Sequence, residues 1–138
     1  MRGSVTTGSM LSGPERQLYG RLVRAFPGHV ILAQVAVGRL LGDRDGAEPE
    51  PAASRHRLVA DFVVCRPDFT ALAVVEFADA VREGAARDAQ PRKDELLQAA
   101  GIKVLRVPAA DLPNEAALRA LIAGLPVAAA GNLMRQAS

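Results

Sequence analysis

Apolar residues recur along the chain with two kinds of spacing, and each spacing predicts a different kind of element. Between residues 12 and 26 they recur every three or four positions, which predicts an amphipathic helix. Shorter runs rich in valine predict strands. In chain order, the pattern predicts a helix at 12–26, strands at 29–37, 57–65 and 70–79, a helix that ends near 100, a strand at 102–108 and a helix that ends near 124. This α-β-β-β-α-β-α order predicts an α/β fold in which helices flank a mixed sheet.

Residues typical of helix ends mark several of these boundaries. Ser12 and Glu15 have the spacing of a capping box at the start of the first helix. Pro91 either starts or kinks the second helix, and Gly101 ends it. The last helix begins near 111 or at Asn114, which is a natural N-cap.

Outside this pattern, the sequence predicts irregular segments. We expect residues 1–11 to be a disordered leader or a cloning remnant, 12–125 to form a single domain, and 126–138 to be a flexible tail. Residues 43–56, rich in proline, alanine and charged residues, are expected to form a mobile loop within the domain.

The composition limits the compartment and the partners. The 138 residues suffice for one domain with a real core. No apolar run approaches the length that spans a membrane, and the single cysteine, Cys65, can form no internal disulfide. We therefore expect a cytoplasmic protein with no membrane partner and Cys65 as a small buried side chain. A net charge of +2 is compatible with nucleic acid but does not require it.

Two acidic residues, Asp61 and Glu76, interrupt the apolar runs at 57–65 and 70–79. A type I turn at 66–69 would pair residues whose numbers sum to 135, whereas a sum of 137 would put Glu76 directly opposite Asp61. Both registers place the two carboxylates on one sheet face, and only a one-residue bulge would separate them. Because opposed like charges destabilise a hairpin, the pair suggests a cation site, although a solvated edge hairpin would give the same pattern.

Lys93 has helical spacing to Leu96, Leu97 and Ala100, which places it on the apolar side of its helix. There it would either meet an anionic partner, for which Asp61 and Glu76 are candidates, or extend its ammonium to solvent from the first helical turn. Two other polar residues leave similar alternatives open. Glu15 either caps its helix or faces the sheet, and Gln34 is either a satisfied core amide or a donor to a site carboxylate.

The order of elements, with an acid on each strand of the central hairpin, resembles the restriction-endonuclease-like PD-(D/E)xK nuclease fold. More specifically, residues 11–123 look like domain-of-unknown-function family 2726, an uncharacterised bacterial branch of that superfamily. The segments that carry the resemblance are LSGPERQLYGRL, VILAQVAV, VADFVVC, VVEFAD, ARDAQPRKDELLQAAGIKVLRVP and LRALI.

This resemblance implies an α-β-β-β-α-β core and a site for Mg²⁺ or Mn²⁺ that hydrolyses phosphodiesters. Asp61 and Glu76 would be metal ligands, Glu15 a further candidate ligand, and Lys93 a catalytic lysine that has moved to the following helix. The usual lysine position, two residues after Glu76, holds Ala78.

Further residues match or accompany the resemblance. Gln34, Asp79 and Asp88 are candidate supporting residues, and Arg87 and Asp94 also follow the family pattern. For Asp88 and Asp94, helix capping or surface ion pairs would explain the residues equally simply. The candidate basic surface comprises Arg82, Arg87, Arg92, Lys93 and Arg106. Its first three residues form a strip of candidate phosphate contacts, although an ordinary solvated face would look similar.

Three functions remain open from the sequence. The first is a metal-dependent endonuclease or exonuclease-type phosphodiesterase acting on DNA or RNA. The second, favoured by Ala78, is a nuclease fold that binds nucleic acid without cleaving it. The third is a protein-interaction or homo-oligomerisation domain, although the low aromatic content counts against a large interface.

Overall fold

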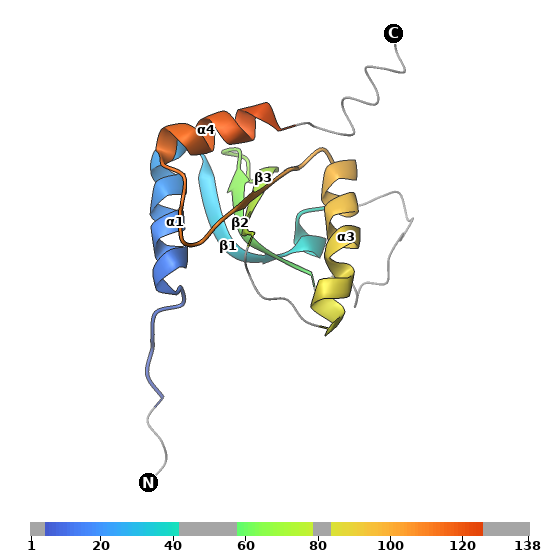
Figure 1. The fold of residues 1–138 in the computed structure, drawn as a ribbon, viewed down its shortest axis with the longest axis horizontal. Helices are drawn as coiled ribbons and strands as arrows, with labels where there is room; N and C mark the ends of the chain where they lie inside the picture. Colours follow the sequence, from blue (N-terminus) through green and yellow to red (C-terminus); the bar gives the residue numbers. More distant parts are fainter. Residues whose placement is uncertain (1–4, 42–57, 79–83, 126–138) are drawn as a thin grey trace.

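The structure is a computed structural model that describes residues 5–41, 58–78 and 84–125, with the backbone alone for 84–90. Its elements, in chain order, are α1 (Gly13–Ala25), β1 (Val30–Ala36), the short 3-10 helix η1 (Val37–Arg39), β2 (Val59–Cys65), β3 (Ala71–Phe77), α3 (Gly84–Ala99), β4 (Lys103–Val107) and α4 (Glu115–Gly124). The predicted order of helices and strands is therefore confirmed within the described residues (Figure 1).

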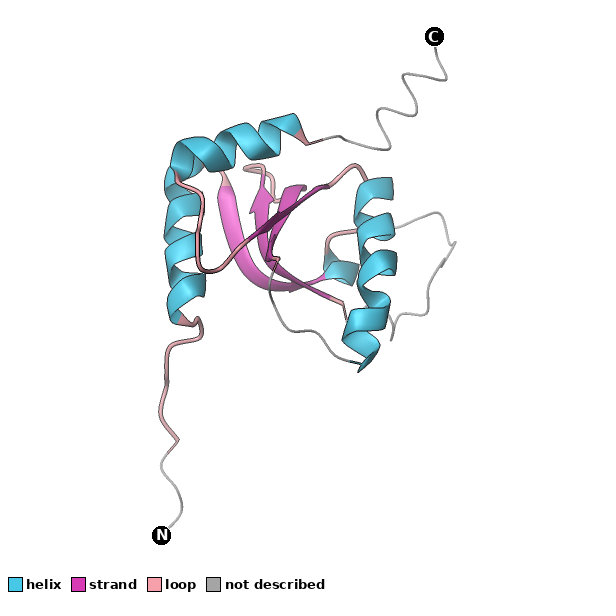
Figure 2. Cartoon of the chain, viewed as in Figure 1, coloured by secondary structure: helices cyan, strands magenta, loops and turns pink. Residues whose placement is uncertain are grey.

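The four strands form one sheet in the order β1-β2-β3-β4. β2 is antiparallel to both of its neighbours, whereas β3 and β4 are parallel and are joined through α3. Helices cover the sheet on both sides, with α1 and α4 toward one face and α3 toward the other (Figure 2). The prediction of a mixed sheet flanked by helices is confirmed.

Alternation along β3 decides which of its residues face α3. Val75 is buried in the cluster that includes residues of α1 and α4, whereas Val74 is buried with Leu96 and Leu97 of α3. Because side chains two positions apart share a face, Glu76 lies on the same side as Val74, beneath α3.

The turn between β2 and β3 is one residue longer than the predicted type I turn. The Arg66 amide donates to the Thr70 carbonyl at 2.9 Å, and the Phe69 amide donates to the Arg66 carbonyl at 2.8 Å. Phe69 has a φ of 70°, the left-handed conformation that a three-residue hairpin loop requires at this position. The register with Arg66 opposite Phe69 is therefore wrong, because Arg66 faces Thr70.

The extra residue in the turn would by itself put Asp61 and Glu76 on opposite faces of the sheet. A second irregularity, in the β2–β3 ladder, returns them to the same face. The register shifts between Val64 and Cys65, and the ladder continues to the pair formed by Phe62 and Val75. Extended by one step beyond its last pair, this register sets the position of Glu76 opposite that of Asp61. Two one-residue irregularities together preserve the alternation of side chains. The carboxylates thus share a sheet face, in the alternative register that places them opposite one another.

The second long helix begins earlier than Pro91. α3 starts at Gly84 and continues through Pro91, so the alternative in which proline starts the helix is wrong. Alanine-rich sequence favours helix before Pro91. An internal proline removes a backbone hydrogen bond and crowds the carbonyl four residues earlier, but here it does not end the helix. This longer helix places Lys93 in the body of α3 rather than in its first turn.

The predicted helix ends are confirmed. Ser12 and Glu15 form the capping box, Asn114 caps α4 by accepting from the Ala117 amide at 2.8 Å, and Gly101 has a φ of 79°. No described helix is long and apolar enough to cross a bilayer. Residues 1–4, the predicted loop at 43–56 and the predicted tail at 126–138 lie outside the described residues.

Candidate functional site

A charge pair lies buried between the sheet and α3. Glu76 is 0% exposed and Lys93 is 2% exposed, and they are the charged side chains that are buried among the described residues. The Lys93 ammonium donates to Glu76 Oε2 and also approaches the Val59 carbonyl at 3.4 Å. The alternative in which Lys93 reaches solvent is therefore wrong, because its position in the middle of α3 directs its side chain onto the sheet.

Arg106 and Asp94 extend this pair toward the surface. Arg106 is the register partner of Glu76 on β4, so its side chain lies on the same face. Its Nη2 is 3.5 Å from Glu76 Oε1 and 2.6 Å from Asp94 Oδ1. Glu76 thus has a cation near each carboxylate oxygen, and the second cation is itself paired.

Sequence reasoning did not assign Arg106 to this site. For Asp94 it offered helix capping or a surface ion pair and named no partner. Alternation along β4 would have put Arg106 on one face with Val104, but identifying its partner requires knowing that β4 pairs with β3. Neither the helix spacing nor the strand spacing alone contains that information.

Asp61 occupies the place where β2 and β3 cease to pair. Its Oδ2 accepts a hydrogen bond of 3.1 Å from the backbone amide of Phe77. The carboxylate therefore substitutes for a ladder carbonyl beyond the last β2–β3 pair, and it is held half-buried beside Glu76. Asp61, Glu76 and Lys93 thus lie on the side of the sheet that α3 covers, which agrees with one of the two alternatives that the sequence left open for Lys93.

Glu15 and Gln34 contact each other rather than Asp61 or Glu76 in the hydrogen bonds given for the described residues. The Ser12 amide donates to Glu15 Oε1 at 2.7 Å, which confirms the capping role. Gln34 Nε2 donates to Glu15 Oε2 at 3.3 Å, and Gln34 has a φ of 56°, uncommon within a strand. Among the described residues no group of three or more His, Cys, Asp and Glu side chains is placed to hold a metal, so Glu15 does not join Asp61 and Glu76 in such a group.

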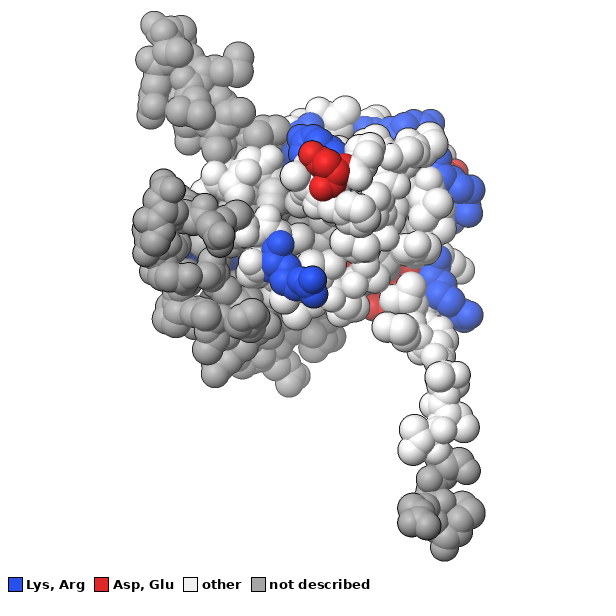
Figure 3. All heavy atoms as spheres, turned by 180° about the vertical axis from the view of Figure 1, so that it is seen from behind, with Lys and Arg blue, Asp and Glu red and all other residues white. Residues whose placement is uncertain are grey.

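The predicted arginine strip is described only in part. Arg92 lies on the surface of α3 and pairs with Glu95 at 3.0 Å. For Arg87 and Asp88 the structure gives only the helical backbone, and Asp79 and Arg82 lie outside the described residues. On the face seen in Figure 3, the basic side chains of the described residues form separate groups.

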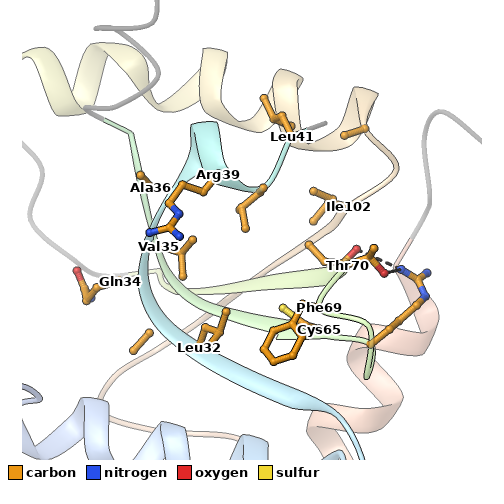
Figure 4. A pocket seen from close by; sticks show the side chains of 15 residues that line it. Leu32, Gln34, Val35, Ala36, Arg39, Leu41, Cys65, Phe69, Thr70 and Ile102 are labelled. Carbon is orange, nitrogen blue, oxygen red and sulfur yellow. Dashed lines mark hydrogen bonds between the residues drawn. The ribbon is translucent and has the colours of Figure 1, made fainter. Parts of the chain in front are cut away.

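A hollow of about 960 Å³ lies on the same side of the sheet as α3, away from the carboxylates. Its walls come from β1, η1, the β2–β3 turn and the segment after α3, and both Phe69 and Cys65 line it (Figure 4). Burial, with a smaller contribution from Asp68, raises the pKa of the Cys65 thiol above its usual value. Cys65 is therefore a protonated, buried side chain, as expected, and not an activated nucleophile.

The comparisons with known proteins support the family resemblance. No curated protein and no solved structure matches the chain. The family model described as a protein of unknown function, DUF2726, matches residues 8–125. The chain belongs to the DUF2726 family. The matched region contains every described helix and strand, together with Asp61, Glu76, Lys93 and Arg106.

Proposed function

We propose that this DUF2726 domain is a metal-dependent nuclease of the restriction-endonuclease-like superfamily, hydrolysing phosphodiester bonds in DNA or RNA. The observation that carries the proposal is the buried Glu76–Lys93 pair beside Asp61 on the adjoining strand. A buried carboxylate and ammonium contribute little net stability relative to apolar residues of the same size, so their presence in the core favours a chemical role.

The donor set fits a small divalent cation. Mg²⁺ and Mn²⁺ prefer oxygen ligands, and Mg²⁺ is commonly held by one or two carboxylates while water and substrate phosphate complete its coordination. Asp61 and Glu76 supply two carboxylates from neighbouring strands. When bound, the cation would activate water and counter the charge that develops on the phosphate.

The chain's own residues have separable roles in this proposal. Asp61 and Glu76 would hold the cation, and the Phe77 amide fixes the Asp61 carboxylate. Lys93 would place an ammonium near the reacting phosphate or water, a role that the exposed Ala78 cannot fill. Because α3 fixes Lys93 next to Glu76, the helix would supply the charge that the strand lacks.

Cleavage of plasmid, linear and single-stranded DNA, and of RNA, in Mg²⁺ or Mn²⁺ tests the proposal. Glu76→Gln, Asp61→Asn and Lys93→Met should each lower the rate at least about a hundred-fold. Lys103→Met is the matched control, because Lys103 instead donates to the Ile122 carbonyl at 3.1 Å on the other side of the sheet. Circular dichroism would confirm that each variant is folded before its rate is compared.

The engagement of Glu76 by two cations favours a second candidate, a nuclease fold that binds nucleic acid without cleaving it. In that case the parent protein would show salt-dependent binding in the presence of EDTA and no cleavage with either metal. That result would contradict the enzyme proposal.

A further inference from the structure

Arg106 contacts two carboxylates, and its contact with Asp94 is much shorter than its contact with Glu76. A single nitrogen, Nη2, is 2.6 Å from Asp94 and 3.5 Å from Glu76. Charge-assisted hydrogen bonds are usually 2.7 to 2.9 Å long, and a contact of 3.5 Å is at the outer limit. The guanidinium is therefore held more closely by Asp94 than by Glu76.

The charges around Glu76 link the Arg106–Glu76 distance to cation binding. Lys93 already neutralises Glu76, so a second close ion pair, with Arg106, would leave a positive charge at the carboxylate. A positive local charge opposes the binding of a cation. Asp94 compensates Arg106, and Asp61 adds a further negative charge nearby.

The exposure of the four side chains agrees with a division between an inner and an outer pair. Glu76 and Lys93 are buried, whereas Arg106 is 34% exposed and Asp94 is 26% exposed. The outer pair thus sits at the edge of the buried pair, with α3 contributing Asp94 and β4 contributing Arg106.

We propose that Asp94 is a positioning residue that holds the Arg106 guanidinium away from Glu76 and so keeps the Glu76 carboxylate available to a divalent cation. This inference rests on the metal dependence of the proposed function. It assigns to Asp94 a role beyond that of a surface ion pair, since Asp94 acts on the cation site only through Arg106.

Mn²⁺ binding, measured by calorimetry on the apo protein, tests the inference in four proteins: the parent, Asp94→Asn, Arg106→Gln and the double variant. Asp94→Asn should weaken binding about ten-fold, because Arg106 then closes on Glu76. In the Arg106→Gln background the same substitution should have no effect, so the double variant should bind like Arg106→Gln. If Asp94→Asn weakens binding equally in both backgrounds, its effect is long-range charge alone and the positioning role is refuted.

Glu95→Gln is the matched control, because it removes the same charge from the next residue of α3 and from an ion pair that does not involve Glu76. Its Mn²⁺ affinity should equal that of the parent.

The crystal structure of the Asp94→Asn variant without metal gives a test that does not depend on the proposed function. Arg106 should move to about 3 Å from Glu76. A guanidinium that stays in place or turns away would overturn the inference. If the parent binds no Mn²⁺, the metal-dependent function fails, while this structure still decides whether Asp94 positions Arg106.

Discussion

Replacing Lys93 with methionine should destabilise the fold strongly, because it leaves the Glu76 carboxylate buried without its main partner. Glu76 is 0% exposed, and its other described cation, Arg106, lies 3.5 Å away and is bound to Asp94. Breaking a buried ion pair by removing one partner costs about 3 to 5 kcal/mol. Because Arg106 remains close to Glu76, we expect the free energy of unfolding to fall by about 3 kcal/mol, which would lower the Tm by roughly 10 °C.

The double variant Glu76→Leu with Lys93→Met separates the desolvation cost from the loss of packing. It replaces both charges with apolar side chains of similar volume, a change that is often neutral or stabilising. We therefore expect it to be more stable than Lys93→Met by at least about 2 kcal/mol, although it carries one more substitution.

Urea unfolding followed by far-ultraviolet circular dichroism would measure these differences, since the chain has no tryptophan. Lys103→Met, which removes a half-buried lysine with only a carbonyl partner in the described structure, should cost no more than about 1 kcal/mol. If Lys93→Met were as stable as Lys103→Met, or if the double variant were no more stable than Lys93→Met, the burial argument would be refuted.

Two further predictions concern the other end of the hairpin. Phe69→Gly should leave stability unchanged or raise it by up to about 1 kcal/mol in urea unfolding, because Phe69 has a φ of 70° and is 66% exposed; a clear loss would show that its ring packs substantially. The pKa of the Cys65 thiol is raised above its ordinary value of 9.0 by folding. The stability that the protonated thiol contributes is therefore fully present below pH 9.0, and it is lost as the pH rises through the pKa of the folded state. The free energy of unfolding should therefore fall above about pH 9 in the parent and fall less in Cys65→Val; parallel pH profiles would contradict this.

Spacing along the chain was enough to predict several parts of the candidate site. The helical spacing of Lys93 from Leu96 and Leu97 placed it on the inner side of α3, and its burial confirms this orientation. Alternation along the strands placed Asp61 and Glu76 on one face. These predictions succeeded because a side chain's direction depends on the local backbone period, which the sequence contains.

The sequence could not decide features that depend on how elements meet. The pairing of Arg66 with Phe69 at the turn was wrong because the left-handed Phe69 and the shift beside Cys65 are not typical of those residue types. Whether Lys93 reaches solvent or is buried depends on where α3 begins. The sequence did not give this start, because Pro91 lies inside the helix rather than at its beginning.

What the sequence by itself determined is the order of elements, their inner faces, the main helix ends and membership of the DUF2726 family. Only the tertiary structure decided that Lys93 pairs with Glu76, that Asp61 bonds the Phe77 amide, and that Arg106 lies between Glu76 and Asp94. The physical reason is that burial and ion pairing depend on contacts between residues far apart in the chain. Such contacts are set by sheet order and helix packing, whereas the periodic pattern of a single segment records only which of its sides faces inward.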